Sequence, residues 1–133
     1  MEIREYGEYD EQEIAALYDA VGWTAYTGDL PALRKGFRSS LLILAAYEGE
    51  KLLGLIRAVG DGHTVVLVQD ILVHPQYQRK GIGTALLKEM LGRFRQVRQI
   101  ELVTDDSEET KTFYRSAGFA ELSELSCCGF MRR

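Results

Sequence analysis

The pattern of apolar and polar residues predicts the strands of this chain. The run that starts at Val65 and stops at His74-Pro75 is rich in β-branched residues, which is typical of a buried strand. Short glycine-containing turns join the runs in the middle of the chain, so we expect an antiparallel meander there. Further strands are predicted over residues 1–6, Leu41–Tyr47, Lys51–Val59, Gln99–Thr104, Phe119–Leu125 and Cys127–Met131.

Apolar residues that recur at intervals of three and four predict helices between these strands. Asp10 and Glu13 have the spacing of a capping box, and the helix that follows is expected to stop near Gly22. After a loop that displays Trp23 and Tyr26, the remaining helices are expected from Asp29, over Thr84–Arg95 and over Glu108–Ala117, the last closed by a left-handed Gly118.

The expected elements follow the order β, α, α, β, β, β, α, β, α, β, β. Because a helix separates the Val65 strand from the Gln99 strand, we expect these two strands to be parallel neighbours. The sequence therefore predicts one α+β domain over residues 1–133, with a mixed, largely antiparallel central sheet flanked by helices on both faces.

Composition narrows the classes of protein. Of the 133 residues, 46% are hydrophobic and 27% are charged, as in an ordinary globular protein, and the net charge of −4 argues against a general nucleic-acid binder. The amino terminus lacks the apolar core of a signal peptide and no apolar run has the length of a membrane span, so we expect a cytoplasmic protein without a membrane partner. The adjacent Cys127 and Cys128 suit neither a disulfide framework nor a metal site, and we expect both to be buried.

A cationic loop with two glycines connects the Val65 strand to the Thr84 helix. Its sequence, Gln78-Arg-Lys-Gly-Ile-Gly83, would direct backbone N–H groups and the positive end of a helix dipole at one point. A P-loop does not fit because Lys80 precedes the first glycine, and a dinucleotide fingerprint does not fit because position 86 is leucine. The pattern predicts a site for an anion, with phosphate as the expected occupant.

The same six residues match the pattern Gln/Arg-x-x-Gly-x-Gly/Ala, and here the chain resembles the GNAT superfamily of acyl-CoA N-acyltransferases. Leu72-Val-His-Pro75 is similar to the end of the family's preceding strand. The stretch from Ser107 to Phe119 is similar to the family's Asn-x-x-Ala-x-x-Phe-Tyr-x-x-x-Gly-Phe, although Ser107 and Thr110 depart from its Asn and Ala. The resemblance implies transfer of an acetyl group from acetyl-CoA to a primary amine of a small molecule or protein. The alternative is a non-catalytic acyl-CoA-binding sensor or regulatory module.

The resemblance also implies a site for acetyl-CoA. The loop would wrap the pyrophosphate, and the Leu72 and Val73 backbone would pair with the pantetheine arm where the central strand splays from the Gln99 strand. Arg79 and Lys80 could contact phosphate through their side chains or be solvated loop charges. The expected cofactor-binding residues are Ile71, Leu72, Val73, Gln78, Arg79, Lys80, Gly81, Ile82, Gly83, Thr84, Ser107, Thr110 and Phe113.

Two residues are candidates for catalysis. Tyr114 matches the family tyrosine near the thioester sulfur, with a core aromatic as the alternative. Asp70 is a charge inside a buried strand and is either a general base, direct or through water, or a structural hydrogen-bond acceptor.

For the acceptor amine we expect a pocket built from Trp23, Tyr26, Arg57 and Asp61, because aromatic walls with one charge of each sign suit an amine. The alternatives are core aromatics and exposed hairpin charges. The strand predicted at the carboxyl terminus could also pair across a homodimer.

Overall fold

The computed structural model describes all residues, 1–133, in two units, Met1–Val103 and Thr104–Arg133. The first unit contains a five-stranded sheet in the order β1-β2-β3-β4-β5. Neighbouring strands are antiparallel except β4 and β5, which are parallel, so the predicted mixed sheet is confirmed. The strands are β1 (Glu2–Glu5), β2 (Leu42–Glu48), β3 (Lys51–Gly60), β4 (Val65–Val73) and β5 (Gln99–Leu102).

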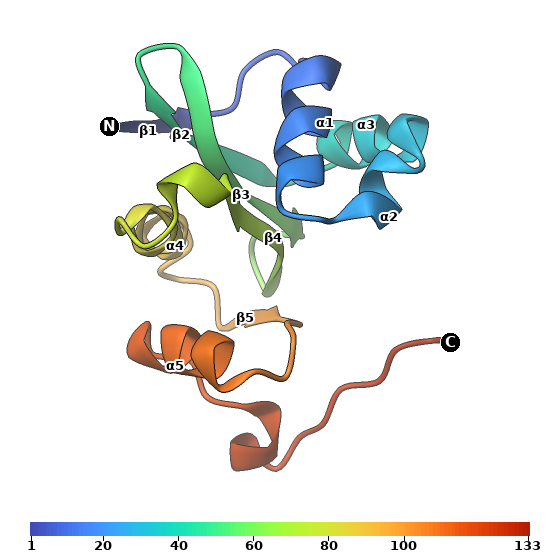
Figure 1. Ribbon diagram of the computed structural model, residues 1–133. Helices are drawn as coiled ribbons and strands as arrows, with labels where there is room; N and C mark the ends of the chain where they lie inside the picture. Colours follow the sequence, from blue (N-terminus) through green and yellow to red (C-terminus); the bar gives the residue numbers. More distant parts are fainter. The chain divides into compact units, whose positions relative to one another are not determined.

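Helices cover both faces of this sheet. One face carries α1 (Glu11–Ala20), α2 (Thr24–Thr27) and α3 (Leu30–Arg38), and the other carries α4 (Ile82–Arg93) (Figure 1). Apolar side chains fill both interfaces: Ile14, Leu17, Tyr18, Leu33, Phe37, Ala45, Leu55 and Leu72 belong to the first, and Leu86, Leu87 and Met90 of α4 are fully buried. The loop expected at Trp23–Tyr26 is instead the start of the short helix α2.

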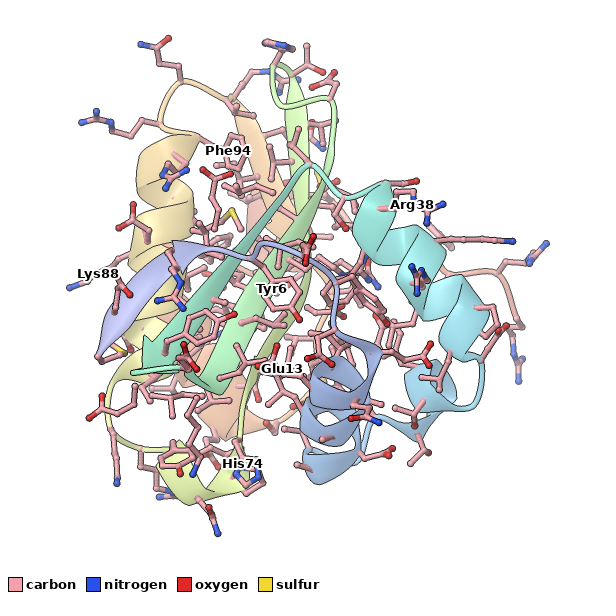
Figure 2. All side chains as sticks on the ribbon, turned by 90° about the horizontal axis from the view of Figure 1, so that it is seen from above. Tyr6, Glu13, Arg38, His74, Lys88 and Phe94 are labelled. Carbon is pink, nitrogen blue, oxygen red and sulfur yellow. The ribbon has the colours of Figure 1, made fainter.

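Asp10 caps α1 as predicted, but the capping box closes through a third residue. The Asp10 carboxylate accepts from the Glu13 backbone N–H at 3.1 Å. The Glu13 carboxylate accepts instead from the Tyr6 hydroxyl at 2.9 Å, and that hydroxyl oxygen accepts the Asp10 backbone N–H at 3.3 Å. Figure 2 shows Tyr6 and Glu13 meeting at the amino end of α1. Tyr6 therefore ties the end of β1 to the first helix.

The second unit contains α5 (Glu108–Ser116) and a 3₁₀ turn over Leu122–Leu125. Gly118 has the predicted left-handed conformation, with φ 97°. The Gly118 N–H donates to the Arg115 carbonyl and the Phe119 N–H donates to the Tyr114 carbonyl, which is the Schellman arrangement. This cap turns the Phe119 ring back onto Tyr114, with ring centroids 5.8 Å apart.

The two strands predicted after α5 are wrong. Residues 119–125 include the 3₁₀ turn, and residues 127–131 have no regular secondary structure. Their β-forming composition produces no strand because the unit offers no second strand to pair with. Cys127 and Cys128, which were expected to be buried, are exposed, and Phe130 is 96% exposed. The strand on which we based a homodimer is therefore not formed.

No helix in the structure combines the length and apolarity needed to cross a membrane.

Candidate functional site

A buried carboxylate lies between the sheet and the α1–α3 layer. Asp70 of β4 is 2% exposed, and its Oδ2 accepts from the Tyr18 hydroxyl at 2.8 Å and from Arg57 Nε at 2.7 Å. Its Oδ1 accepts from the Tyr26 hydroxyl at 2.5 Å. Arg57 also donates from Nη1 to Ser40 Oγ at 3.1 Å. Since β3 and β4 pair Arg57 opposite Asp70, the sheet register brings the two charges together.

Asp70, its three donors Tyr18, Tyr26 and Arg57, and Gln69, whose Nε2 donates to the Tyr26 hydroxyl at 3.1 Å, form the Asp70 cluster. The pKa shifts of the three donors keep them protonated. Burial raises the pKa of the Tyr18 phenol, and the Asp70 charge raises it further. Burial and the hydrogen bond to Asp70 likewise raise the pKa of Tyr26. For Arg57 burial acts to lower the pKa, but the Asp70 charge and hydrogen bond outweigh it and the pKa is raised. Both phenols therefore stay proton donors and Arg57 stays charged.

Three donors occupy the two Asp70 oxygens, so little capacity remains to take a proton from a substrate. Of the two roles considered for Asp70, this geometry favours the structural acceptor.

Beyond Asp70, the β4 backbone has one open edge. β5 pairs only with Val65–Val68, whereas β3 continues alongside β4 as far as Val73. The β3–β4 register also slips by one residue, because Arg57 faces Asp70 while Ala58 faces Val68, which leaves Gln69 as an extra, bulged residue. The sheet thus opens immediately after Val68, as expected for a splayed strand.

The alternation of an antiparallel ladder decides which backbone groups face this open edge. His74 N–H donates to the Leu53 carbonyl at 2.8 Å, so Gly54 and Val73 form a non-hydrogen-bonded pair. The N–H and C=O groups of Val73 and Ile71 therefore point away from β3, and Val73 O accepts from Gln78 Nε2 at 2.9 Å. Leu72, which was expected to offer its backbone, is directed toward β3 instead. The available edge is formed by Ile71 and Val73.

The loop before α4 presents an uncapped helix amino terminus. Gly81 is the N-cap in a left-handed conformation, with φ 82°, and no side chain caps the helix. Arg79 is also left-handed, with φ 63°. The N–H groups of Ile82, Gly83 and Thr84 begin the helix, where the macrodipole is positive. Ile82 contributes only its backbone, because its side chain is 6% exposed and belongs to the core.

Two lysines add positive charge beside this loop. Lys80 Nζ lies 5.7 Å and Lys51 Nζ lies 4.8 Å from the centroid of the Tyr77 ring. Lys51 begins β3 and was not among the predicted site residues. In the sequence it is one charge at a strand start, and only the fold brings it near the loop. The arrangement can bind an anion next to the open edge of β4.

In the second unit, α5 carries the remaining predicted residues. Tyr114 is 9% exposed, and its ring packs edge-on against Phe113, with centroids 5.0 Å apart. Burial first, and the Asp105 charge second, raise the pKa of Tyr114 to about 12. Ser107 caps α5, since its Oγ accepts the Thr110 N–H at 3.2 Å and donates to Thr110 Oγ1 at 2.9 Å. Both hydroxyls are thus engaged in hydrogen bonds at the amino end of α5.

The predicted acceptor residues are only partly brought together. Trp23 and Tyr26 are neighbours, with ring centroids 6.3 Å apart, and Tyr26 and Arg57 share the Asp70 cluster. Asp61 lies elsewhere, in the turn between β3 and β4. Its carboxylate accepts from the Thr64 hydroxyl and from the backbone N–H groups of His63, Thr64 and Val65. These hydrogen bonds, that of the Thr64 hydroxyl most of all, lower the pKa of Asp61.

Two residues of the cluster were missed in the sequence. Tyr18 falls on the apolar stripe of α1, and Gln69 looks like an ordinary polar residue in a strand. A tyrosine predicted to be fully buried requires a hydrogen-bond partner, and this was the available signal for Tyr18. Gln69 had none, because the bulge that exposes it depends on the register with β3.

Comparisons with known proteins show the family of this chain. The model of the acetyltransferase (GNAT) domain matches residues 39–121, more than half of the chain. The chain belongs to the GNAT acetyltransferase family. Among solved structures, a GNAT-family acetyltransferase from Streptococcus pneumoniae TIGR4 is 41% identical, with a TM-score of 0.90 over 99% of this chain and 96% of that chain.

The curated relatives are longer than this chain. A histone acetyltransferase of Glycine max is 29% identical over 126 residues, which cover 85% of this chain and 53% of that protein. An uncharacterized N-acetyltransferase of Pyropia yezoensis is 27% identical over 112 residues, covering 80% of this chain and 63% of that protein. The chain thus spans between about half and two thirds of the length of these relatives.

Proposed function

We propose that this GNAT protein transfers an acetyl group from acetyl-CoA to a primary amine of a small molecule or protein. The observation that carries the proposal is the open Ile71–Val73 edge of β4, which leads into the uncapped start of α4. Acetyl-CoA fits this pair of features, since its pantetheine amides suit a free strand edge and its phosphates suit a helix amino terminus. When bound, it supplies an acetyl group activated as a thioester.

The protein's own residues have three proposed roles. The N–H groups of Ile82, Gly83 and Thr84 bind the phosphates, with Lys51, Arg79 and Lys80 as the nearby cations. The backbone groups of Ile71 and Val73 hold the amide-rich arm. As the family resemblance implies, we propose that Tyr114 donates a hydrogen bond from Oη to the leaving sulfur. Burial raises the pKa of Tyr114 to about 12, so the phenol keeps its proton at neutral pH.

The reaction balances without a further reactant. The amine nitrogen attacks as the neutral base, a C–N bond forms, the C–S bond breaks, and the proton lost by nitrogen is regained by sulfur. The products are an amide and a free thiol.

Incubation of the protein with acetyl-CoA and a panel of primary amines should release free thiol in step with formation of acetylated amine. Thiol release followed with a disulfide reagent and product mass by mass spectrometry measure the two products. Triethylamine, which has no N–H to lose, is the matched control and should give no amide.

A second function has its own support. Three donors occupy Asp70, so the cluster contains no uncommitted carboxylate to serve as a base. This favours a non-catalytic acyl-CoA-binding module. Tight binding of acetyl-CoA by calorimetry, with neither amine acetylation nor slow thioester hydrolysis, would support the module and exclude the enzyme.

The Tyr114→Phe variant should lower kcat by about 100-fold or more, since it removes the proposed proton donor to sulfur. Its affinity for acetyl-CoA, measured by calorimetry, should stay within about twofold of the unmodified protein. In the unmodified protein, titration of Tyr114 should not reduce kcat between about pH 7 and pH 10, because the phenol remains protonated below its raised pKa.

Tyr47→Phe is the matched control, because Tyr47 is 8% exposed and Tyr114 is 9% exposed. Its kcat should not change. Equal kcat values in the Tyr114→Phe and Tyr47→Phe proteins would remove Tyr114 from the mechanism.

A further inference from the structure

Gln69 is the one polar residue of the Asp70 cluster whose side chain is exposed at the opening of the sheet. It is the extra residue of the β4 bulge, and it follows Val68, the last residue of β4 that pairs with β5. Its Nε2 lies 3.1 Å from the Tyr26 hydroxyl. Gln69 thus joins the buried cluster to the point where β4 leaves β5.

The hydrogen bonds of the cluster fix the orientation of the Gln69 carboxamide. A phenol has one proton to donate, and Tyr26 donates it to Asp70 Oδ1 at 2.5 Å. The carboxylate is acceptor-only and is tied to Arg57 Nε at 2.7 Å, so the direction of the Tyr26 bond cannot reverse. Tyr26 Oη must therefore accept from Gln69, which places Nε2 toward Tyr26 and leaves Oε1 free to accept.

The surroundings of Gln69 Oε1 indicate the class of ligand. Tyr26 connects it to Trp23, which is 36% exposed, and the only carboxylate in the cluster is paired with Arg57. The cluster thus offers aromatic faces and one neutral acceptor, and its own carboxylate is not free to bind an ammonium group.

We propose that Gln69 Oε1 accepts an N–H of the acceptor amine and so orients its nitrogen, and that the acceptor is a primary amine with an aromatic or apolar substituent. This inference rests on the proposed acetyl transfer and names its acceptor side. Arg57, Asp70 and Tyr26 act behind Gln69 as positioning residues. The amine binds as the neutral base, and its lone pair stays available because it donates to Oε1 and accepts nothing from it.

The test uses the chain of residues 1–133 with 2-phenylethylamine as the probe and spermidine as a polycationic comparison. Gln69→Leu keeps the size of the side chain and removes Oε1. It should lower kcat/KM for 2-phenylethylamine about tenfold, mainly through KM, with acetyl-CoA affinity unchanged by calorimetry. Gln99→Leu, at an exposed glutamine of β5, is the control and should leave kcat/KM unchanged.

Two measurements distinguish orientation from a purely structural effect. Tyr26→Phe should lower kcat/KM by a similar factor, and the double variant should be no worse than Gln69→Leu alone, because the two residues act through one oxygen. In protein without acetyl-CoA, added 2-phenylethylamine should shift the Gln69 side-chain amide resonances in a ¹⁵N NMR spectrum, whereas those of Gln99 should not move.

Unchanged kcat/KM in Gln69→Leu, or multiplicative losses in the double variant, would overturn the proposed role of Gln69. A higher kcat/KM for spermidine would overturn the substrate class. If the unmodified protein acetylates no amine at all, both this inference and the proposed function fail, whereas activity that is indifferent to Gln69 leaves the proposed function standing.

Discussion

Replacing Asp70 with alanine should lower the free energy of unfolding by about 3–5 kcal/mol, the largest loss of stability that we expect from a single polar residue. The substitution leaves the Arg57 guanidinium, 5% exposed, without its charge partner. It also removes the acceptor of the Tyr18 and Tyr26 hydroxyls, which are then left without their partner. Urea denaturation followed by circular dichroism measures the change in the free energy of unfolding. The dependence of that free energy on urea concentration should stay the same in both proteins.

The control for this prediction is an exposed ion pair in the same unit. Glu89 pairs with Arg93 at 3.4 Å on the surface of α4, and Glu89→Ala should cost only about 0–1 kcal/mol. Replacing both buried charges, in Arg57→Met/Asp70→Leu, should recover only part of the lost stability, because no unpaired charge remains but the Tyr18 and Tyr26 hydroxyls still lack their acceptor. A loss below about 1 kcal/mol in Asp70→Ala would contradict the view that the cluster is a tightly coupled buried network.

Substitution of Gly81 by valine should weaken acetyl-CoA binding at least about tenfold, as measured by calorimetry. An added Cβ at Gly81 meets no protein atom within 4 Å, so the effect does not come from a clash inside the protein. The φ of 82° is the cause, because a β-branched residue is strained by about 1–2 kcal/mol in this conformation and the loop must rearrange. The same Cβ would occupy space that phosphate oxygens need beside the helix start.

Gly92→Val is the matched control, since Gly92 lies in the same helix, without a positive φ and with open space around its added Cβ. Valine is a slightly better helix former than glycine, so this variant should keep its acetyl-CoA affinity and its stability. If both variants bind acetyl-CoA as the unmodified protein does, the α4 amino terminus is not the phosphate site.

Local signals in the sequence were sufficient for most of the first unit. Asp10 and Asp29 cap helices where their spacing predicts, and the meander and the parallel crossover have their predicted neighbours. These features depend on residues that are close in the chain, or on the period of burial, which a sequence displays directly. The same signals failed after Phe119, because a strand requires a partner edge and the sequence does not say whether one is present.

The candidate site likewise contains features that local sequence predicts and features that depend on the fold. The glycines and cations of Gln78–Gly83, and the family resemblance that they carry, are local in the chain, so both the GNAT family and the loop that we propose as the anion site could be predicted from the sequence. The surroundings of Asp70 became known from the fold alone, which encloses it with Tyr18, Tyr26 and Arg57. The same is true of the open edge, which Ile71 and Val73 face in place of Leu72, and of Gln69, which lies where the sheet opens. The physical reason is strand register: a slip of one residue exchanges the faces and edges of a strand without changing a letter of its sequence.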